Sequence, residues 1–330
     1  MTPDTEVVVV GAGVMGLAAA RALAQAGRRV VVLEQFHVGH DRGSSHGSSR
    51  IVRLSYPDVR WVRLAAEAYP LWRRLEAECG RPLLELHGTL DLGDWQPNRD
   101  ALAACGAPFE VLDGADIERR FPLRADGASG LFQPDGGIVL ADLALAALRD
   151  SAVAAGAELQ EGVRVDDLAA LDAGAVVVTA GAWAPALADV DAIPTRETTS
   201  YFTLDTPLPS VIDTTAGDEL GYALLAPGAG LKAGLHQSGP PIDPDEAGSP
   251  DEAIVERTTA WVRRRFRGAG DAVHTETCLY TTRPGDEFLL ERRGRVVVGS
   301  PCSGHGFKFA PVIGARLAAL AAEALAEGSP

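Results

Sequence analysis

The stretch Glu6–Gly16, which reads EVVVVGAGVMG, decides the fold of this chain. Four consecutive valines are typical of a strand that is buried on both faces of a parallel sheet, and the alanine-rich residues up to Gln25 are typical of a helix. A second apolar run, VVVLE, follows and ends at Glu34. The order strand, glycine turn, helix, strand and acid predicts the first unit of a Rossmann-like α/β domain.

Each glycine of this turn has a separate task in such a unit. Gly11 makes the tight turn, Gly13 lets the backbone approach a pyrophosphate, and Gly16 lets the helix and strand pack closely. The phosphates then lie at the positive end of the helix, and Glu34 accepts hydrogen bonds from a ribose diol. The sequence therefore predicts a dinucleotide site, with a glycine-rich packing turn as the alternative.

The rest of the chain divides into segments of two kinds. Helix-then-strand patterns and buried strands recur in residues 1–79, 136–189 and 278–330, which we assign to a discontinuous Rossmann-like dinucleotide-binding domain. Residues 80–135 and 190–277 are richer in prolines, acids and alternating apolar positions. They predict an α+β substrate domain with a mostly antiparallel sheet and a helix near residues 251–268. The arginine-rich end of that helix, VRRRFRG, is interpreted as a solvated face.

Composition excludes several classes of function. The 330 residues carry 45 acids against 30 Lys plus Arg, a formal charge of −15, which disfavours binding to nucleic acid and to anionic membranes. We find no run of about 20 uninterrupted apolar residues, the length that a membrane helix needs. The four cysteines show no metal-ligand spacing, so we expect free thiols, no metal site and a cytoplasmic location.

Only two cations in the chain are lysines, Lys232 and Lys308. Lys308 follows a second glycine-rich turn, SGHGFK, which joins an apolar strand to the last helix. A helix start and a lysine together supply the positive potential that a flavin needs where negative charge collects on reduction. NAD does not need a second such site, so the pattern favours FAD.

Several motifs of the chain resemble those of a known family. They are VVVVGAGVMG, GSSHGSSRIVRLSYP, GAWAP, GLKAGLH, TCLYT and SGHGFKF, and they run over most of the chain. In this order and spacing, the chain resembles the FAD-dependent amine oxidases of the D-amino-acid-oxidase superfamily, and within it the monomeric sarcosine oxidase and N-methyltryptophan oxidase group. SGHGFKF and the GSSHG loop are far more specific than the glycine fingerprint.

The resemblance implies roles for both lysines. Lys232 matches the lysine that lies over the flavin and helps dioxygen accept electrons, a task that suits a compact cation better than the broad fork of arginine. Lys308 and Arg53 match the pair that binds the substrate carboxylate and orients the amine. The alternative is that the two lysines fall in these motifs by chance.

The resemblance also implies roles on the remaining site residues. Cys278 matches the cysteine that is bonded covalently to the flavin, with a buried small hydrophobe as the alternative. Tyr280 falls at an active-site tyrosine that either binds substrate or packs. His236 and His305 are assigned to positioning and electrostatics, with proton transfer as a second possibility. The further cofactor contacts that we expect are Ser45, His46, Arg50, Val165, Gly181 and Gly306.

The chain departs from the family at two substrate-facing places. Ser48 stands in the flavin loop where sarcosine oxidases usually carry an acid. In residues 218–230, DELGYALLAPGAG, we do not find the tyrosine-bearing strand that the family places against sarcosine. These departures affect the choice of amine, whereas the flavin and oxygen motifs are intact.

The sequence thus predicts a monomeric FAD-dependent oxidase of secondary amino acids such as sarcosine, which binds a small amine-bearing carboxylate and O2 and forms an imine and H2O2. A second hypothesis is a dehydrogenase or desaturase of a cyclic or larger amine, such as pipecolate, proline or a biosynthetic intermediate. A third is a flavin-binding protein without turnover.

Overall fold

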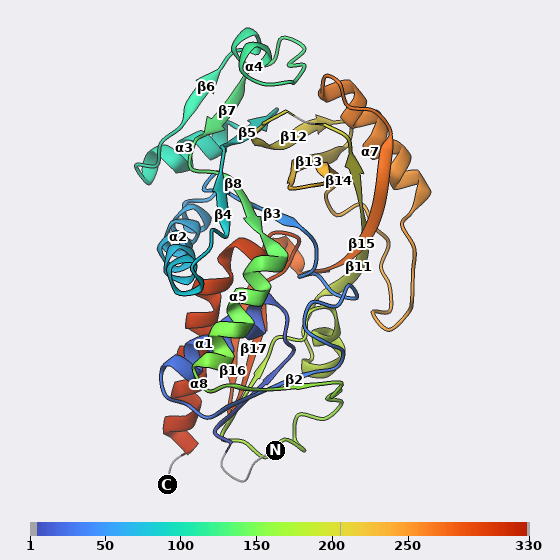
Figure 1. The fold of residues 1–330 in the computed structure, drawn as a ribbon. Helices are drawn as coiled ribbons and strands as arrows, with labels where there is room; N and C mark the ends of the chain where they lie inside the picture. The colour runs from blue at the N-terminus through green and yellow to red at the C-terminus, as the bar shows by residue number, and fades with distance from the viewer. Residues whose placement is uncertain (1–4, 205, 329–330) are drawn as a thin grey trace.

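The computed structural model describes residues 5–204 and 206–328, and a six-stranded sheet forms its lower half in Figure 1. The strand order is β16, β17, β10, β1, β2 and β9. All neighbours pair in parallel except β16 and β17, so the predicted Rossmann-like parallel sheet is confirmed. The bounds are Val7–Val10 (β1), Val30–Glu34 (β2), Glu158–Glu161 (β9), Ala175–Val178 (β10), Leu289–Arg293 (β16) and Val296–Ser300 (β17).

Burial on both faces explains the valine run in β1. Val7 and Val9 belong to the apolar core formed with the helices α1 (Val14–Gln25), α5 (Ala141–Ala154) and α8 (Ala310–Gly328). Val8 and Val10 belong to a separate core on the opposite face, together with residues of the short helix α6 (Ala184–Ala188). Since successive side chains of a strand point to opposite faces, every position of this strand has to be apolar.

The second large sheet has eight strands in the order β15, β11, β14, β13, β12, β5, β7 and β6. Every pair is antiparallel except β12 with β5, which confirms the predicted mostly antiparallel sheet. The bounds are Thr89–Leu92 (β5), Glu110–Leu112 (β6), Gly130–Gln133 (β7), Ile193–Phe202 (β11), Ser210–Ala216 (β12), Glu219–Ala226 (β13), Gly230–Leu235 (β14) and Ala272–Thr282 (β15). A small sheet joins Ser49–Val52 (β3), Gly137–Leu140 (β8) and Leu84–Leu86 (β4).

The predicted helix of the second region is α7, Glu252–Arg265, which packs on the eight-stranded sheet. Asp251 caps its start by accepting hydrogen bonds from the backbone amides of Ala253 and Ile254. The other helical segments are α2 (Val59–Cys79), α3 (Gln96–Ala104), α4 (Gly114–Arg120), η1 (Gly181–Trp183), η2 (Pro284–Asp286) and η3 (Phe307–Phe309).

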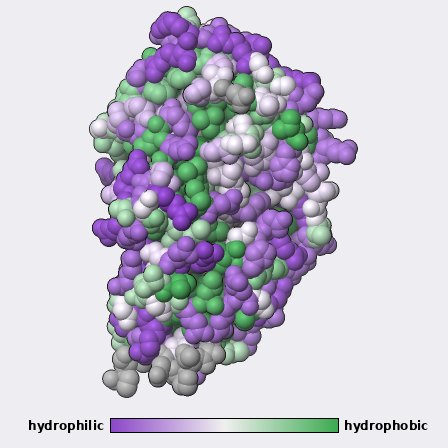
Figure 2. Space-filling view, viewed as in Figure 1, coloured by the Kyte–Doolittle hydropathy of each residue, from purple (hydrophilic) through white to green (hydrophobic). Residues whose placement is uncertain are grey.

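One helical stretch, Phe307–Glu327, is long and apolar enough to cross a membrane by length and composition alone. Our criterion of uninterrupted apolar residues did not detect it. In the structure the helix packs against α1, α2 and the strands β10 and β17, with Ile313 and Leu317 fully buried. Packing inside the fold buries 44% of its apolar window. Figure 2 shows that the surface around the hydrophobic middle of one face is largely hydrophilic.

The domain boundary that we expected at residue 278 falls inside β15, which pairs with β11 from residue 272 to residue 282. A strand that runs through residue 278 does not mark a domain boundary there, and the two-domain division of the chain stays a prediction.

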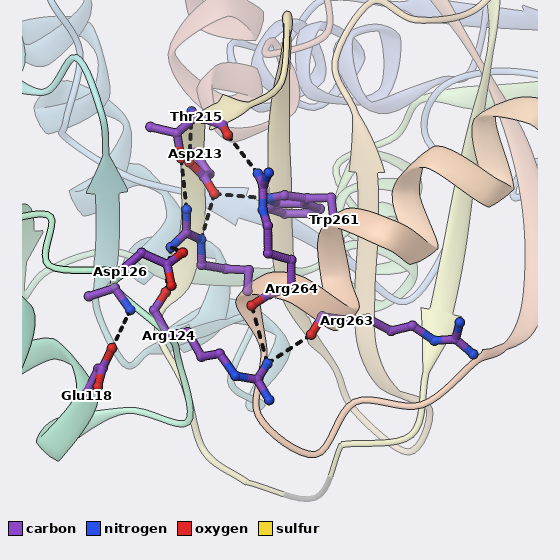
Figure 3. Close-up of polar contacts among 10 residues, drawn as sticks. Glu118, Arg124, Asp126, Asp213, Thr215, Trp261, Arg263 and Arg264 are labelled. Carbon is purple, nitrogen blue, oxygen red and sulfur yellow. Dashed lines mark hydrogen bonds and ion pairs between the residues drawn. The ribbon is translucent and has the colours of Figure 1, made fainter.

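The arginine-rich end of α7 is only partly solvated, because Arg265 is buried. Its Nε lies 2.8 Å from Asp213 Oδ2, and Asp213 also accepts a hydrogen bond from Trp261 Nε1 at 2.9 Å (Figure 3). Burial would raise the pKa of Asp213, but hydrogen bonds from Thr215 and Trp261 and the charge of Arg265 outweigh it and lower the pKa. This buried pair ties α7 to β12.

We predict that Asp213→Ala lowers the free energy of unfolding by about 3 to 5 kcal/mol, because it removes the buried partner of Arg265 and leaves only the exposed carboxylate of Asp126, 3.6 Å away. The matched control is Asp271→Ala, which removes the partner of Arg263 in an exposed pair and costs about 0.5 kcal/mol or less. Urea unfolding measures both. Equal effects of the two variants contradict the assignment.

Candidate active site

A cavity of about 710 Å³ lies between the carboxyl ends of the parallel strands and one face of the antiparallel sheet. Its wall includes Val10, Glu34, Thr179 and Ser300 from the ends of four parallel strands. All the site residues expected from the sequence line this cavity, except Gly16 and His46. The expected residues that line it are Gly11, Gly13, Glu34, Ser45, Arg50, Arg53, Val165, Gly181, Lys232, His236, Cys278, Tyr280, His305, Gly306 and Lys308.

Two glycines of the turn, Gly11 and Gly16, leave no room for a side chain. A Cβ on Gly16 would lie 1.9 Å from the carbonyl oxygen of Gly11, which itself has a φ of +97°. Gly13 stands at the start of α1 and gives it no side-chain cap. Ser45 supplies one partner instead, since its Oγ accepts a hydrogen bond from the backbone amide of Val14 at 3.1 Å. The turn therefore presents bare backbone to the cavity.

Glu34 fixes the other side of this turn. Its carboxylate accepts hydrogen bonds from the backbone amides of Ala12 at 2.7 Å and Phe36 at 3.0 Å. His40 Nε2 lies 3.6 Å from the same carboxylate. Burial lowers the pKa of His40, so the ring is a neutral neighbour near pH 7. Glu34 lines the cavity at the end of β2, where a ribose diol would lie in a dinucleotide-binding sheet.

Arg50 folds the loop of residues 43–50 around itself. Its guanidinium donates hydrogen bonds to the carbonyl oxygens of Ser44 at 2.8 Å, His46 at 2.6 Å and Ser49 at 2.9 Å. Burial and the Arg50 charge lower the pKa of His46 to about 4, so this imidazole is neutral at pH 7. The loop thus brings a single fixed positive charge to the cavity.

Lys232 enters the cavity from β14 and is buried. Its Nζ and Arg50 Nη1 both lie 3.3 Å from the point that a Cβ on Gly47 would occupy, so the two cations meet at the loop. Burial and the Arg50 charge lower the pKa of Lys232, whereas the carboxylate of Glu276 acts in the opposite direction. That carboxylate lies 2.5 Å from Nζ. Sequence reasoning did not single out Glu276.

Tyr56 is a second residue that sequence reasoning missed, and both Lys308 and Arg53 contact it. Lys308 Nζ donates hydrogen bonds to Tyr56 Oη at 2.8 Å and to the carbonyl oxygen of His305 at 2.7 Å. The Arg53 guanidinium lies 4.5 Å from the centre of the Tyr56 ring. Burial and the Arg53 charge hold the pKa of Lys308 well below its ordinary range.

A buried polar network supports Arg53 from behind. Asp91 Oδ1 lies 3.2 Å from Arg53 Nη1, and the other oxygen of this carboxylate accepts hydrogen bonds from Ser55 and Asn98. Asp91 does not line the cavity. Its contacts hold the guanidinium in a fixed place, which suits the binding of a carboxylate.

His305 has a defined tautomer. Its Nε2 lies 3.2 Å from the carbonyl oxygen of Asp286, which can only accept, so Nε2 carries the proton and Nδ1 accepts from Tyr56 Oη at 3.4 Å. Burial and the Lys308 charge lower the pKa of His305 to about 3, and burial lowers that of His236 to about 4. Both imidazoles are therefore neutral at pH 7 and fit the positioning role.

Cys278 lies on the cavity face of β15 and is buried. Burial raises the pKa of its thiol to about 11, although Arg50 and Lys232 both act to lower it. Cys302, which we expected to be structural, also lines the cavity. All four cysteines are free thiols in the structure.

Our expectation that residues 218–230 lack a tyrosine-bearing strand is wrong. These residues contain β13, and its Tyr222 lines the cavity. Tyr222 is paired in register with Gly234, two residues beyond Lys232 on β14. Because side chains alternate along a strand, the pattern ELGYALLA could have placed Tyr222 on the face that carries Lys232.

The residues present fit a flavin dinucleotide. A turn of bare backbone and an acid at the end of β2 suit the pyrophosphate and ribose, and buried cations lie at the other end of the cavity. The buried Ser300 hydroxyl faces the same space and has no hydrogen-bond partner among the described residues. Residues 5–204 and 206–328 contain no group of three or more acids, histidines or cysteines that could hold a metal ion.

A nucleotide-binding parallel sheet, a second sheet that closes the cavity, and cations placed to stabilise a reduced cofactor together define the class of flavin-dependent oxidoreductases. The chain belongs to the FAD dependent oxidoreductase (DAO) family, whose model matches residues 6–320. The family resemblance inferred from the motifs is thereby confirmed.

Individual proteins similar to this chain include sarcosine oxidases. The peroxisomal sarcosine oxidase of Mus musculus is 31% identical, over 94% of this chain and 90% of the relative. The monomeric sarcosine oxidase of Streptomyces avermitilis is also 31% identical, over 97% and 94%. The solved structure of NikD, described as an unusual amino acid oxidase essential for nikkomycin biosynthesis, matches with a TM-score of 0.86 and 30% identity over 96% and 94%.

Proposed function

We propose that this protein is an FAD-dependent oxidase of secondary amino acids, with sarcosine or another N-methyl amino acid as substrate and O2 as electron acceptor. The observation that carries the proposal is the environment of Lys308. This cation is buried, its hydrogen-bond partners are neutral, and no carboxylate pairs with it among the described residues. A substrate carboxylate that bridges Lys308 and Arg53 would supply the missing negative charge.

The names of similar proteins support this choice of substrate. Besides the sarcosine oxidases, an N-methyl-L-tryptophan oxidase of Yersinia pestis is 29% identical over 97% of this chain. Both names describe N-methyl amino acids, which combine a carboxylate with a secondary amine. A cavity with paired cations at one place and neutral aromatic and imidazole groups around them suits this combination of charges.

The residues of the chain would bind and orient, while the cofactor supplies the redox chemistry. Bound FAD would accept two electrons from the carbon next to the amine nitrogen and pass them to dioxygen. For sarcosine the balanced reaction is sarcosine + O2 + H2O → glycine + formaldehyde + H2O2, with an imine hydrolysed on the way. Arg53 and Lys308 would hold the carboxylate, and the neutral His236 and His305 would add no charge that repels the amine. Lys232 would stabilise the negative charge that builds up on dioxygen.

A second candidate function is a dehydrogenase or desaturase of a cyclic or larger amine. The likeness to NikD supports only its substrate side, a biosynthetic intermediate, because that protein is described as an unusual amino acid oxidase essential for nikkomycin biosynthesis. A third candidate is a flavin-binding protein without turnover, which the buried substrate-side cations disfavour.

We predict that a secondary amino acid bleaches the visible flavin band of the anaerobic protein and that air restores it with one equivalent of H2O2. Sarcosine, other N-methyl amino acids, pipecolate and proline are added separately, and the methyl ester of each active amine is the control. The ester should react at least about tenfold more slowly at low concentration, since it cannot pair with Lys308 and Arg53.

The three candidate functions give different results in this experiment. Bleaching followed by less than one equivalent of H2O2 favours the dehydrogenase. Bleaching by dithionite but by no amine contradicts the small-amine assignment and favours a larger substrate or a protein without turnover.

We predict that Lys232→Met slows reoxidation of the reduced protein by O2 about a hundredfold, because it removes a preorganised positive charge. Reduction by the amine should change far less. Lys308→Met is the control, and it should weaken amine binding while reoxidation stays fast. Stopped-flow absorbance separates the two half-reactions, and unchanged reoxidation in Lys232→Met contradicts the role proposed for this lysine.

We also propose that FAD is bonded covalently to Cys278, the buried thiol that lines the cavity beside Arg50 and Lys232. Acid precipitation should then leave the yellow colour in the protein pellet, whereas Cys278→Ser should release it into the supernatant. Cys302→Ser is the matched control and should retain the colour. Release of flavin from the unsubstituted protein contradicts the covalent bond.

A monomeric state and a cytoplasmic location complete the proposal. The printed names of several relatives, such as the monomeric sarcosine oxidase of Streptomyces avermitilis, support the first. Free thiols at all four cysteines are compatible with a reducing compartment.

A further inference from the structure

Glu276 on β15 is a partly exposed acid that neither the sequence motifs nor the proposed reaction uses. Its Oε1 accepts hydrogen bonds from Lys232 Nζ at 2.5 Å and from Tyr201 Oη at 2.7 Å. The side chain is 20% exposed, against 5% for that of Lys232. The carboxylate is therefore the more exposed partner of the pair, and it is itself held by the phenol of Tyr201.

The pairing of three strands produces this contact. β11 lies between β14 and β15, and it pairs Tyr201 with Lys232 on one side and Thr199 with Glu276 on the other. Residues two apart on a strand share a face, so Tyr201 and Thr199 point the same way as Lys232 and Glu276. The three side chains of Tyr201, Lys232 and Glu276 therefore meet on the cavity face of the sheet.

Other charged and titratable groups surround the pair of Lys232 and Glu276. Arg50 and the neutral His46 approach from residues 44–50, Asp142 approaches from α5 by accepting from the Gly47 amide, and the Cys278 thiol lies farther along β15. Glu276 Oε1 lies 3.4 Å from the point that a Cβ on Gly47 would take. Glu276 brings a carboxylate to this same place from a different element.

Glu276 and Arg50 have opposite effects on the pKa of Lys232. Burial and Arg50 both lower the pKa of Lys232, and Glu276 is the main group that raises it. Burial would raise the pKa of Glu276, but Lys232 and the hydrogen bond from Tyr201 outweigh it and lower the pKa to about 2. The carboxylate is therefore ionised over the whole range in which the protein is handled.

We propose that Glu276 is a positioning residue that holds Lys232 as a protonated ammonium group at the cavity wall, and thereby sets the pH range in which the reduced protein reacts with dioxygen. This inference rests on the proposed function for the role of Lys232. The effect of Glu276 is exerted through Lys232 and needs no contact with substrate.

The chain itself allows a direct test, because Lys232 and Lys308 are its only lysines. Holoenzyme grown with lysine labelled with ¹³C and ¹⁵N at the side-chain end gives two lysine signals, and Lys308→Met assigns them. We expect Glu276→Gln to lower the pH at which the Lys232 signal titrates by about one pH unit or more, since an opposite charge at this distance is lost. The Lys308 signal should keep its midpoint.

Two further variants distinguish charge from structure. Glu276→Asp keeps the negative charge and should restore most of the midpoint. Tyr201→Phe removes a hydrogen bond to the same carboxylate but leaves the charge, so it should leave the Lys232 midpoint within a few tenths of a pH unit if the charge is what matters. A Lys232 midpoint that Glu276→Gln leaves in place overturns the proposal, as does a Lys232 that is already neutral at pH 7 in the unsubstituted protein.

The functional consequence is measured on dithionite-reduced protein mixed with O2 at a series of pH values. In Glu276→Gln the rate should fall at lower pH than in the unsubstituted protein, by the same interval as the NMR midpoint. In Lys232→Met this pH-dependent fall of the rate, the limb of the profile that Lys232 causes, should vanish. The double variant with Glu276→Gln should then have the same pH profile as Lys232→Met. A limb that persists without Lys232 overturns the proposal. Neither measurement uses an amine, so failure of the substrate assignment gives a different pattern from failure of this inference.

Discussion

The burial of both lysines in one cavity is the constraint on which the site depends. An ammonium group loses its hydration when it is buried, and it stays charged only if hydrogen bonds or opposite charges replace that hydration. Arginine supplies all the other Lys and Arg cations of the chain, and a buried guanidinium would stay charged without such help. The state of each lysine is therefore set by its immediate neighbours, and these neighbours come from distant parts of the chain.

The two sheets provide these neighbours in different ways. In the parallel sheet, the turns after β1 and β17 both lie at the carboxyl ends of the strands, so bare backbone and the Lys308 loop reach one cavity. In the antiparallel sheet, the alternation of side chains places Lys232, Tyr222 and Cys278 on one face. Because Gly16 has no side chain, α1 can pack closely on the Gly11 turn at the end of β1.

The sequence alone was sufficient for elements whose signal is local. The valine run of β1, the glycine turn and the Glu34 acid have patterns that one stretch of chain contains, and the structure has these elements as predicted. Sequence reasoning missed Tyr56, Asp91 and Glu276, because each of them contacts a site residue that is distant in the sequence. Glu276 is 44 residues from Lys232, and Tyr56 is 252 residues from Lys308. Arg265 was misread for the same reason, since an arginine-rich helix end does not show that Asp213 lies beneath it.

The two lysines differ in what compensates their charge, and this difference agrees with different tasks. Lys232 has an ionised carboxylate at 2.5 Å, so its charge is compensated before any ligand binds. Among the residues that the structure describes, Lys308 has a phenol and a carbonyl oxygen as its hydrogen-bond partners, and the nearby cation Arg53 opposes its charge. A site of the first kind is complete and can act on a small uncharged molecule such as dioxygen. A site of the second kind is incomplete, and an anionic ligand stabilises it by restoring the balance of charge. Binding of a carboxylate at Lys308 should therefore also favour protonation of that lysine, because ligand and proton stabilise each other at the same place.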